Sequence, residues 1–407
     1  MKSPLKSSIV FALSAFSVQA NSLYYIPNQV EESLPIEWTL GINAIYDDNT
    51  TPTAAGPDDE TFSVNPFVES TFISASPQTT WDVSAKLGIL YYFDEPSAAG
   101  TDDTYSQSRV TANLTHQFSE RLSFSTRNLV AHEIEPDFSL GIATSRQSEE
   151  YLLATTDNSI TYQITPRLAN VTGINISWLE IDDNSSSNRF TLTGYDELRY
   201  VLTPQTVGTV KYRYSQTSAD GAASDSTDQF FTIGANHNLT PTTIIVAEGG
   251  VQFRDVDSAN GDNSTNPYLS LTLRSRMNEQ LTIGGFVRYA AEANDTVRPV
   301  AGVSSEFDSR LTLRVGLTAD YQVSQRLSFF SGLDVINSSF EEGRTTAGGA
   351  SVGDQDELLV NANIGASLQF TDYLSGSISY NFTDSNSDFA NSEYERNRVS
   401  LGLRAEF

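Results

Sequence analysis

Toward its C-terminal end the chain reads Arg310-Leu311-Thr312-Leu313-Arg314-Val315-Gly316-Leu317-Thr318-Ala319-Asp320-Tyr321-Gln322-Val323. Every odd-numbered residue in this segment is apolar, and every even-numbered residue is polar, charged or glycine. Because successive side chains of a β-strand point to opposite faces, this alternation predicts a strand with one apolar and one polar face. Segments 81–91, 269–277, 358–370 and 374–382 alternate in the same way, and helical spacing appears nowhere at comparable strength. The sequence therefore predicts an all-β protein.

Short polar turns and longer polar stretches divide the alternating segments in a regular order. The longer stretches are rich in Asp, Ser, Gly and Asn, as in 47–60 and 341–356. The short turns lie near Pro77, Glu120, Pro166, Pro204, Pro241, Glu279, Gln325 and Asp372. Eight turns and nine longer stretches join eighteen strands, with sixteen as the alternative count. This order predicts a transmembrane antiparallel up-and-down β-barrel with short periplasmic turns and longer extracellular loops.

The N-terminus carries an export pattern. Lys2 and Lys6 precede an apolar stretch, 9–18, which ends close to Ala20, a small residue that a signal peptidase accepts. The stretch is shorter than the roughly 20 residues that a membrane-spanning helix needs. We therefore predict a signal peptide at 1–20, a periplasmic N-terminal segment at 21–35 and the transmembrane β-barrel at 36–407.

Composition and charge exclude several classes of function. The chain has 24 basic and 51 acidic residues, three histidines and no cysteine. The acidic excess argues against a nucleic-acid partner, and the lack of cysteine excludes disulfides and thiolate ligands. Segment 255–262 resembles a calcium loop only superficially, because it lacks the closing bidentate glutamate. We expect no metal and no cofactor.

A catalytic reading depends on the three histidines. His116 and His237 share the apolar register near periplasmic strand ends, and His132, with Glu133 and Glu135, forms the one candidate cluster for a nucleophilic triad. Interfacial or solvated histidines are far commoner than catalytic ones. We therefore expect that the protein is not an enzyme.

The strands of a soluble β-sandwich show the same alternation of apolar and polar residues, so other features must distinguish it from a membrane barrel. The apolar rows end in aromatic residues, as expected for girdles at the two membrane interfaces. Examples are Tyr91, Tyr92, Phe93, Phe118, Tyr212, Tyr214, Tyr289, Phe370 and Tyr380. The opposite rows hold Ser, Thr, Asn, Gln, Gly and Arg, which suit a watery lumen better than a protein core.

The C-terminus carries a family resemblance. Val399, Leu401, Leu403 and Ala405 alternate up to a terminal Phe407, similar to the closing strand of Gram-negative outer-membrane proteins. The resemblance implies that the protein lies in the bacterial outer membrane and that this strand is the signal read by the barrel-assembly machinery. Segment 392–403 resembles more narrowly the β-barrel porin type 2 group, of which some members accompany exopolysaccharide export loci. That resemblance implies a pore-like barrel and carries over no binding residues.

The inward row of an eighteen-stranded barrel should line a water-filled channel, since barrels of 16 to 18 strands are wide enough to stay open. No plug domain and no long constriction loop is evident, so narrowing must come from wall side chains or from several modest loops leaning in together. The apolar register assigns these basic residues to the lumen: Lys86, Arg109, Arg127, Arg199, Lys211, Arg213, Arg254, Arg274, Arg276, Arg288, Arg310, Arg314, Arg396 and Arg398. The inward acids that it identifies are fewer: Asp82, Glu197, Glu248, Asp320 and Asp334.

Two interpretations of this basic lining remain open. Rings of Arg and Lys select for anions, which predicts a channel for passive diffusion of small polar or anionic solutes. The alternative is that the arginines bond to inward carboxylates and hydroxyls and stiffen the wall. A second function stays open as well, a non-conducting or accessory barrel of an exopolysaccharide export or envelope assembly system. The expected partners are outer-membrane lipid, lipopolysaccharide and the barrel-assembly machinery, and a homo-oligomer is left open.

Overall fold

The computed structural model describes residues 36–50, 60–94, 103–134, 150–181, 188–220, 224–257, 263–292, 297–300, 302–307, 309–346, 348–389 and 392–407. The predicted signal peptide and the predicted segment 21–35 lie outside these residues. In the part of the chain that is described, no helix is long and apolar enough to span a membrane.

Eighteen antiparallel strands form a single closed sheet, in which each strand pairs with the barrel strands before and after it. They are β1 (Glu37–Asp47), β2 (Thr61–Ala75), β3 (Thr79–Tyr92), β4 (Thr104–Ser119), β5 (Leu122–Glu133), β6 (Tyr151–Thr165), β7 (Leu168–Ile181), β8 (Arg189–Thr203), β9 (Thr206–Ala219), β10 (Ser226–Thr240), β11 (Thr243–Val256), β12 (Ser264–Arg276), β13 (Leu281–Glu292), β16 (Ser309–Gln322), β17 (Leu327–Glu341), β19 (Gln355–Gln369), β20 (Leu374–Ser387) and β21 (Tyr394–Glu406). The predicted fold and the count of eighteen are confirmed.

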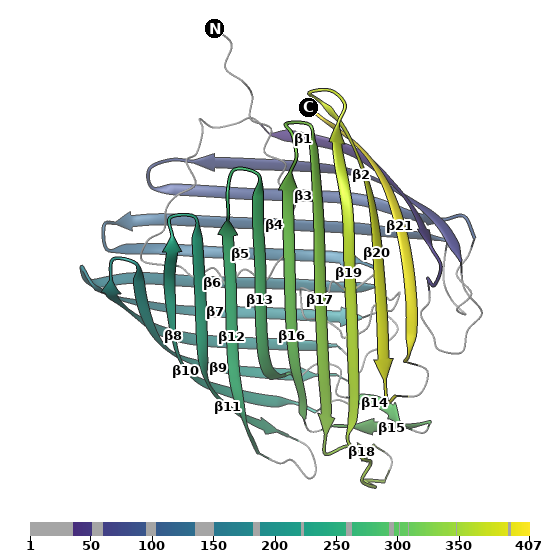
Figure 1. Ribbon diagram of the computed structural model, residues 1–407. Helices are drawn as coiled ribbons and strands as arrows, with labels where there is room; N and C mark the ends of the chain where they lie inside the picture. The colour runs from purple at the N-terminus through teal and green to yellow at the C-terminus, as the bar shows by residue number, and fades with distance from the viewer. Residues whose placement is uncertain are drawn as a thin grey trace.

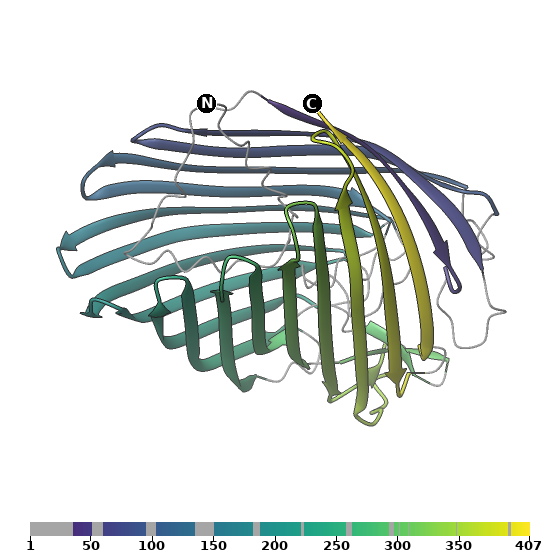
Figure 2. The same cartoon turned by 45° about the horizontal axis from the view of Figure 1, so that its top comes forward.

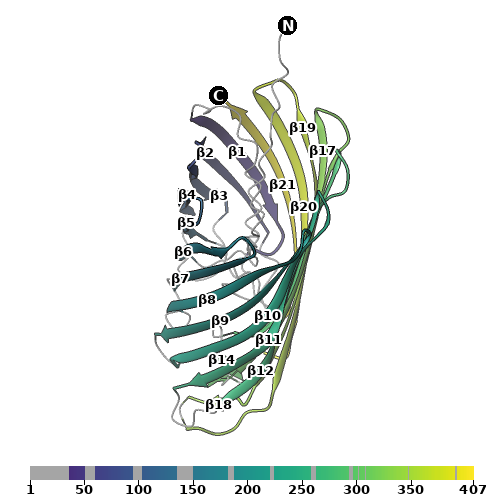
Figure 3. The same cartoon turned by 90° about the vertical axis from the view of Figure 1, so that its left-hand side faces the viewer.

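The first and last strands close the barrel. β1 pairs with β21 in an antiparallel register that runs from Thr39 opposite Glu406 to Asp47 opposite Arg398. Beyond the ladder, the backbone N–H of Phe407 donates to the carbonyl oxygen of Trp38 at 2.8 Å. Figure 3 shows the purple first strand beside the yellow last strands. The sheet therefore has no free edge at this seam, which is what a barrel in a membrane requires.

All eight short turns use the same local chemistry. Each begins with a Ser, Thr or Asn side chain that accepts a hydrogen bond from a backbone N–H two or three residues later, and this geometry reverses the chain tightly. The accepting residues are Ser76, Ser119, Thr165, Thr203, Thr240, Asn278, Ser324 and Thr371. The short turns lie at the end of the barrel where β1 begins and β21 ends (Figure 1).

The outer face of the barrel exposes many large apolar side chains. Ile233, Leu317 and Ile364 expose 70%, 49% and 59% of their surface and face away from the lumen. Tyr162 and Tyr200 stand near the turn end of this face and Trp178 and Phe190 near the loop end. Such a belt between two aromatic girdles matches the hydrocarbon layer of a membrane.

One residue of the predicted girdles is placed wrongly by the sequence. Tyr92 turns inward, is 2% exposed, and packs edge-on against the ring of Tyr105 with centroids 5.9 Å apart. Three aromatic residues, Tyr91, Tyr92 and Phe93, follow one another at the end of β3. The alternation of apolar and polar residues is therefore lost there, and the sequence does not show which of the three point outward.

Several inward aromatic rings lie flat on the wall over a glycine of the neighbouring strand. Phe67 of β2 is directly opposite Gly41 of β1, and a Cβ on that glycine would lie 2.2 Å from the ring. The same arrangement joins Tyr195 to Gly173, Phe286 to Gly316 and Phe330 to Gly365. The missing side chains allow the rings to cover the backbone instead of projecting into the lumen.

Two neighbouring loops combine into a small sheet at the opposite end from the turns (Figure 2). Its strands are β14 (Val297–Val300), β15 (Val303–Glu306) and β18 (Arg344–Thr345). Phe307 from the first loop packs against the inward Phe340 with ring centroids 5.4 Å apart, and against Phe389 at 5.7 Å. Arg298 of β14 also reaches the inward carboxylate of Glu357 at 3.2 Å. These two loops thus pack against the inner wall.

Candidate functional site: the lumen wall

The candidate site is the inner face of the barrel, because the alternation along each strand turns the basic residues toward it. On β16, Arg310 and Arg314 are buried while the outward Leu313 is 37% exposed. The same parity holds on the other strands, so all fourteen basic residues assigned to the lumen by the sequence lie on the inner face. Whether they act on a solute stays a prediction.

The inner face holds more acidic residues than the sequence reading identified. The five predicted ones, Asp82, Glu197, Glu248, Asp320 and Asp334, do point inward. Nine others on the described barrel strands were missed: Glu37, Asp47, Glu69, Glu133, Asp157, Asp228, Glu292, Glu357 and Glu406. Most of them lie where a strand runs into an acidic loop, so they look like loop residues. Their parity with an inward arginine, as for Glu292 and Arg288 on β13, was the signal that could have found them.

Arginines of the same wall bind Asp47, Glu133, Asp157, Glu197, Asp228 and Glu292. Arg109 makes a bidentate pair with Glu133, with Nε–Oε1 at 2.9 Å and Nη2–Oε2 at 2.7 Å. Glu292 receives Arg314 at 2.9 Å and Arg310 at 3.5 Å. Planar guanidinium and carboxylate groups suit such paired bonds. The wall-stiffening network considered at the sequence level is therefore present.

A second part of this network crosses the seam between β1 and β21. Asp47 accepts hydrogen bonds from Nε of Arg396 at 2.9 Å and from Nε of Arg398 at 3.0 Å. The side chains of Asp47 and Arg396 are 3% and 2% exposed. Both arginines thus join β21 to β1, and the side chain of Arg398 keeps 18% of its surface exposed.

Another set of inward basic residues forms no ion pair with any carboxylate in the described part of the chain. These residues are Lys86, Arg213, Arg274, Arg276, Arg288 and Arg404. Arg404 was missed by the sequence reading. No described carboxylate of the wall contacts these charges directly, and the six side chains face the lumen.

Aromatic rings hold three of these cations in place. The Nζ of Lys86 lies 4.5 Å from the ring centroid of Phe67, and the guanidinium carbon of Arg404 lies 5.7 Å from the same centroid. The guanidinium of Arg213 stacks over Phe230 at 3.7 Å. Cation–π contacts fix the position of a charge without neutralising it. The flat ring of Phe67 therefore brings two cations together on the lumen wall.

Arg127 on β5 and Arg274 on β12 face the lumen from strands that lie seven strand-to-strand steps apart along the wall. Arg127 binds Asp157 at 3.3 Å, and Arg274 is exposed. Arg127 is thus paired with a carboxylate of the wall, whereas Arg274 is not paired with any described carboxylate.

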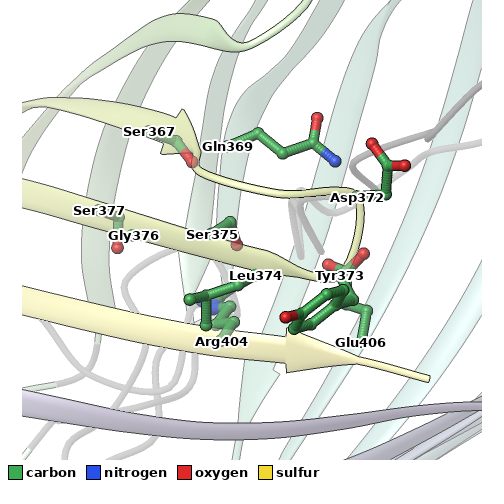
Figure 4. Close-up of a pocket in the computed structure, with 10 residues that line it drawn as sticks. All are labelled: Ser367, Gln369, Asp372, Tyr373, Leu374, Ser375, Gly376, Ser377, Arg404 and Glu406. Carbon is green, nitrogen blue, oxygen red and sulfur yellow. The ribbon is translucent and has the colours of Figure 1, made fainter.

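A small cavity at the turn end offers no site for a solute. Figure 4 shows it between the ends of β19, β20 and β21, with Tyr373, Arg404 and Glu406 among its lining residues. Its volume of about 30 Å³ has room for water and little else. The candidate path for a solute is therefore the barrel lumen itself.

The structure places His132 and Glu133 of the candidate cluster on opposite faces of β5. His132 occupies an outward position on β5, whereas Glu133 points inward to Arg109, and Glu135 lies outside the described residues. His116 and His237 lie on the outer face, where their Nδ1 atoms hydrogen-bond Thr79 and Thr206 at 2.8 and 2.9 Å. Within the described ranges, no group of three His, Asp or Glu side chains could hold a metal ion.

No protein-family model matches the chain, and no curated protein matches it. The chain is similar to several solved structures over nearly its full length. Pseudomonas aeruginosa OccK2 (OpdF) is 10% identical with a TM-score of 0.49, covering 93% of this chain and 100% of that chain. Pseudomonas aeruginosa OccK9 (OpdG) is 12% identical with a TM-score of 0.48 and the same coverage. A BenF-like porin from Pseudomonas fluorescens Pf-5 is 14% identical with a TM-score of 0.47, covering 91% and 98%. The narrower resemblance to the β-barrel porin type 2 group stays a prediction.

Proposed function

We propose that this protein is a channel of the bacterial outer membrane through which small polar solutes diffuse, with a preference for anions. The observation that carries the proposal is the set of inward cations without a carboxylate partner, Lys86, Arg213, Arg274, Arg276, Arg288 and Arg404, inside a closed eighteen-stranded barrel. Barrels of this size leave an aqueous passage. Basic side chains in such a passage attract anions and repel cations.

The ion-pair network supports this proposal as well as stabilising the wall. It pairs several inward carboxylates with arginines, including Asp47, Glu133 and Glu292. A solute in the lumen therefore meets the remaining cations with less competition from fixed negative charge. This attraction should weaken as salt rises, since exposed charges are screened over about 8 Å at physiological ionic strength.

The outer-membrane location is supported by the apolar outer belt and by the closing strand. Val399, Leu401 and Leu403 face outward and are 38%, 54% and 50% exposed, and the terminal Phe407 is 71% exposed. We include in the proposal that this strand is the signal for the barrel-assembly machinery. In the structure this segment is a regular strand, β21, with apolar residues on its outward face.

The test is single-channel recording of the refolded protein in a planar bilayer with a potassium chloride gradient. Stable conductance steps with an anion-selective reversal potential are expected. The double variant Arg274→Gln/Arg288→Gln should move the reversal potential toward that of cations. Arg167→Gln/Arg326→Gln, which removes the same charge from two turns, should leave it unchanged. A folded barrel that gives no steps, or a cation-selective wild type, would contradict the proposal.

A further inference from the structure

A group of polar side chains lies on the outer face of the barrel, near the middle of four neighbouring strands. On most strands the middle of the outward row is aliphatic, as in Leu313, Val315 and Leu317 of β16. On β5 to β8 the corresponding positions are instead polar or acidic. They are Thr126, Asn128, Thr156, Asn158, Asn170, Thr172 and Asp196, and we call them the outer polar patch.

Hydrogen bonds divide the outer polar patch into an amide half and a carboxylate half. In the amide half, on β5 and β6, Thr156 donates to Asn128 at 2.7 Å and Asn158 donates to Thr156 at 2.8 Å. In the carboxylate half, on β7 and β8, Asn170 donates to Oδ1 of Asp196 at 2.9 Å and Thr172 donates to Oδ2. The side chains are thus organised, although they face away from the lumen.

Asp196 lies at the depth where lipid would tolerate it least. It is the fourth of seven outward residues on β8, between Phe190 near the loop end and Leu202 near the turn end. It is exposed, and no Lys or Arg occupies an outward position on any described barrel strand. A charged side chain on the lipid face destabilises a barrel most near the bilayer midplane. The wall itself therefore does not offset the charge of Asp196.

The two halves of the patch complement each other across a symmetry axis along the membrane normal. Asn158 lies eight positions before the turn residue Pro166, and Asp196 lies eight positions before Pro204, so both sit at a similar height above the turn end. The carboxylate of Asp196 can accept more than its two internal bonds, and the amide of Asn158 has a second N–H. Rotation about such an axis brings the carboxylate half of one barrel to the amide half of the next.

We propose that the outer polar patch is the interface through which copies of this chain associate side by side in the membrane. Lipid tails offer no hydrogen-bond donors at this depth, and lipid headgroups lie at the membrane surfaces. Polar side chains and small residues are what holds protein surfaces together within a bilayer. Gly194, next to Asp196 in the outward row, leaves open space on the wall, so a second barrel can approach closely.

The chain has no cysteine, so crosslinking gives a clean test. In Asn158→Cys/Asp196→Cys, the two positions lie two strands apart on one barrel, about 9 Å or more, too far for an internal disulfide. Oxidation of membranes that contain this variant should give disulfide-linked multiples of the chain. The control Ile364→Cys/Leu401→Cys, with the same strand spacing on another part of the wall, should give none.

A second measurement uses the unmodified protein. In mild detergent its mass, corrected for bound detergent, should be a multiple of the chain mass, and Asp196→Leu should reduce it to that of a single chain. Circular dichroism checks that the variant keeps its β-structure. A single-chain mass for the wild type would overturn the proposal. So would equal crosslinking of the two cysteine pairs, or a crosslinked product that contains a different protein.

Discussion

The guanidinium of Arg396, on the last strand, donates from Nε to both carboxylate oxygens of Asp47, on the first strand, at 2.9 and 3.0 Å. These residues are separated by 349 positions in the chain, and both are buried. This ion pair therefore joins the first strand of the barrel to the last, and these two strands lie far apart in the sequence.

Asp47→Asn should destabilise the folded barrel by about 3–5 kcal/mol, because removal of one partner leaves a buried guanidinium without its counter-charge. Unfolding by denaturant, followed by tryptophan fluorescence, measures the change. Asp82→Asn is the control, since no described side chain bonds to that inward carboxylate, and it should change stability little. Equal losses for the two variants would show that the seam bond has no special weight.

Gly41→Ala should disturb the cation pair on Phe67. The added methyl group would lie 2.2 Å from the ring, so the ring must move away from the wall and carry Lys86 and Arg404 with it. Overpacking of this kind costs about 1–3 kcal/mol. Conductance and denaturant stability should both fall. Gly249→Ala is the control, because the nearest atom to its added methyl lies at 3.8 Å, and it should behave like the wild type.

Phe307→Ala should release the small loop sheet from the inner wall. Phe307 is 1% exposed and touches both Phe340 and Phe389, and loss of a buried phenylalanine costs about 3–5 kcal/mol locally. We expect larger or noisier single-channel conductance and faster protease cleavage within 293–308. Val303→Ala, at a position that is 43% exposed on β15, should leave both readouts unchanged. An unaltered conductance in Phe307→Ala would mean that the sheet does not limit the passage.

Ser324→Ala tests the shared chemistry of the turns. Its Oγ accepts bonds from the backbone N–H groups of Arg326 and Leu327 at 3.3 and 3.1 Å. Loss of such exposed bonds should cost about 0.5–1.5 kcal/mol, measured by denaturant unfolding. Gln325→Ala in the same turn removes a side chain for which the structure gives no hydrogen bond, and it should have a smaller effect. The reverse order would contradict the role assigned to the hydroxyl.

The strand plan was predictable because a two-residue period and the turn chemistry are local properties of the sequence. Leu311 to Val323 reveals both faces of β16 without knowledge of its neighbours. The inward direction of Arg310 and Arg314 follows from the same parity. The ion pairs are different, because Glu292 meets these arginines only through the register between β13 and β16. The sequence of β13 alone, or of β16 alone, does not determine this register, so it does not predict the ion pairs.

Two other features escaped the sequence reading for different physical reasons. β14, β15 and β18 have four, four and two residues, too few for any periodicity to show. The outer polar patch could have been found, because Asn158 and Asp196 share the parity of the outward Ile160 and Leu198. It was overlooked because polar residues were assumed to belong to the lumen.

The repetition of one turn chemistry at all eight positions means that each of these chain reversals depends only on a few residues of its own hairpin. Such a wall can gain or lose one hairpin by duplication or deletion without a new kind of junction. The width of the passage would then change in discrete increments over evolutionary time, since barrel diameter grows roughly in proportion to strand number. The largest solute that such a barrel admits would therefore depend on how many hairpins it contains.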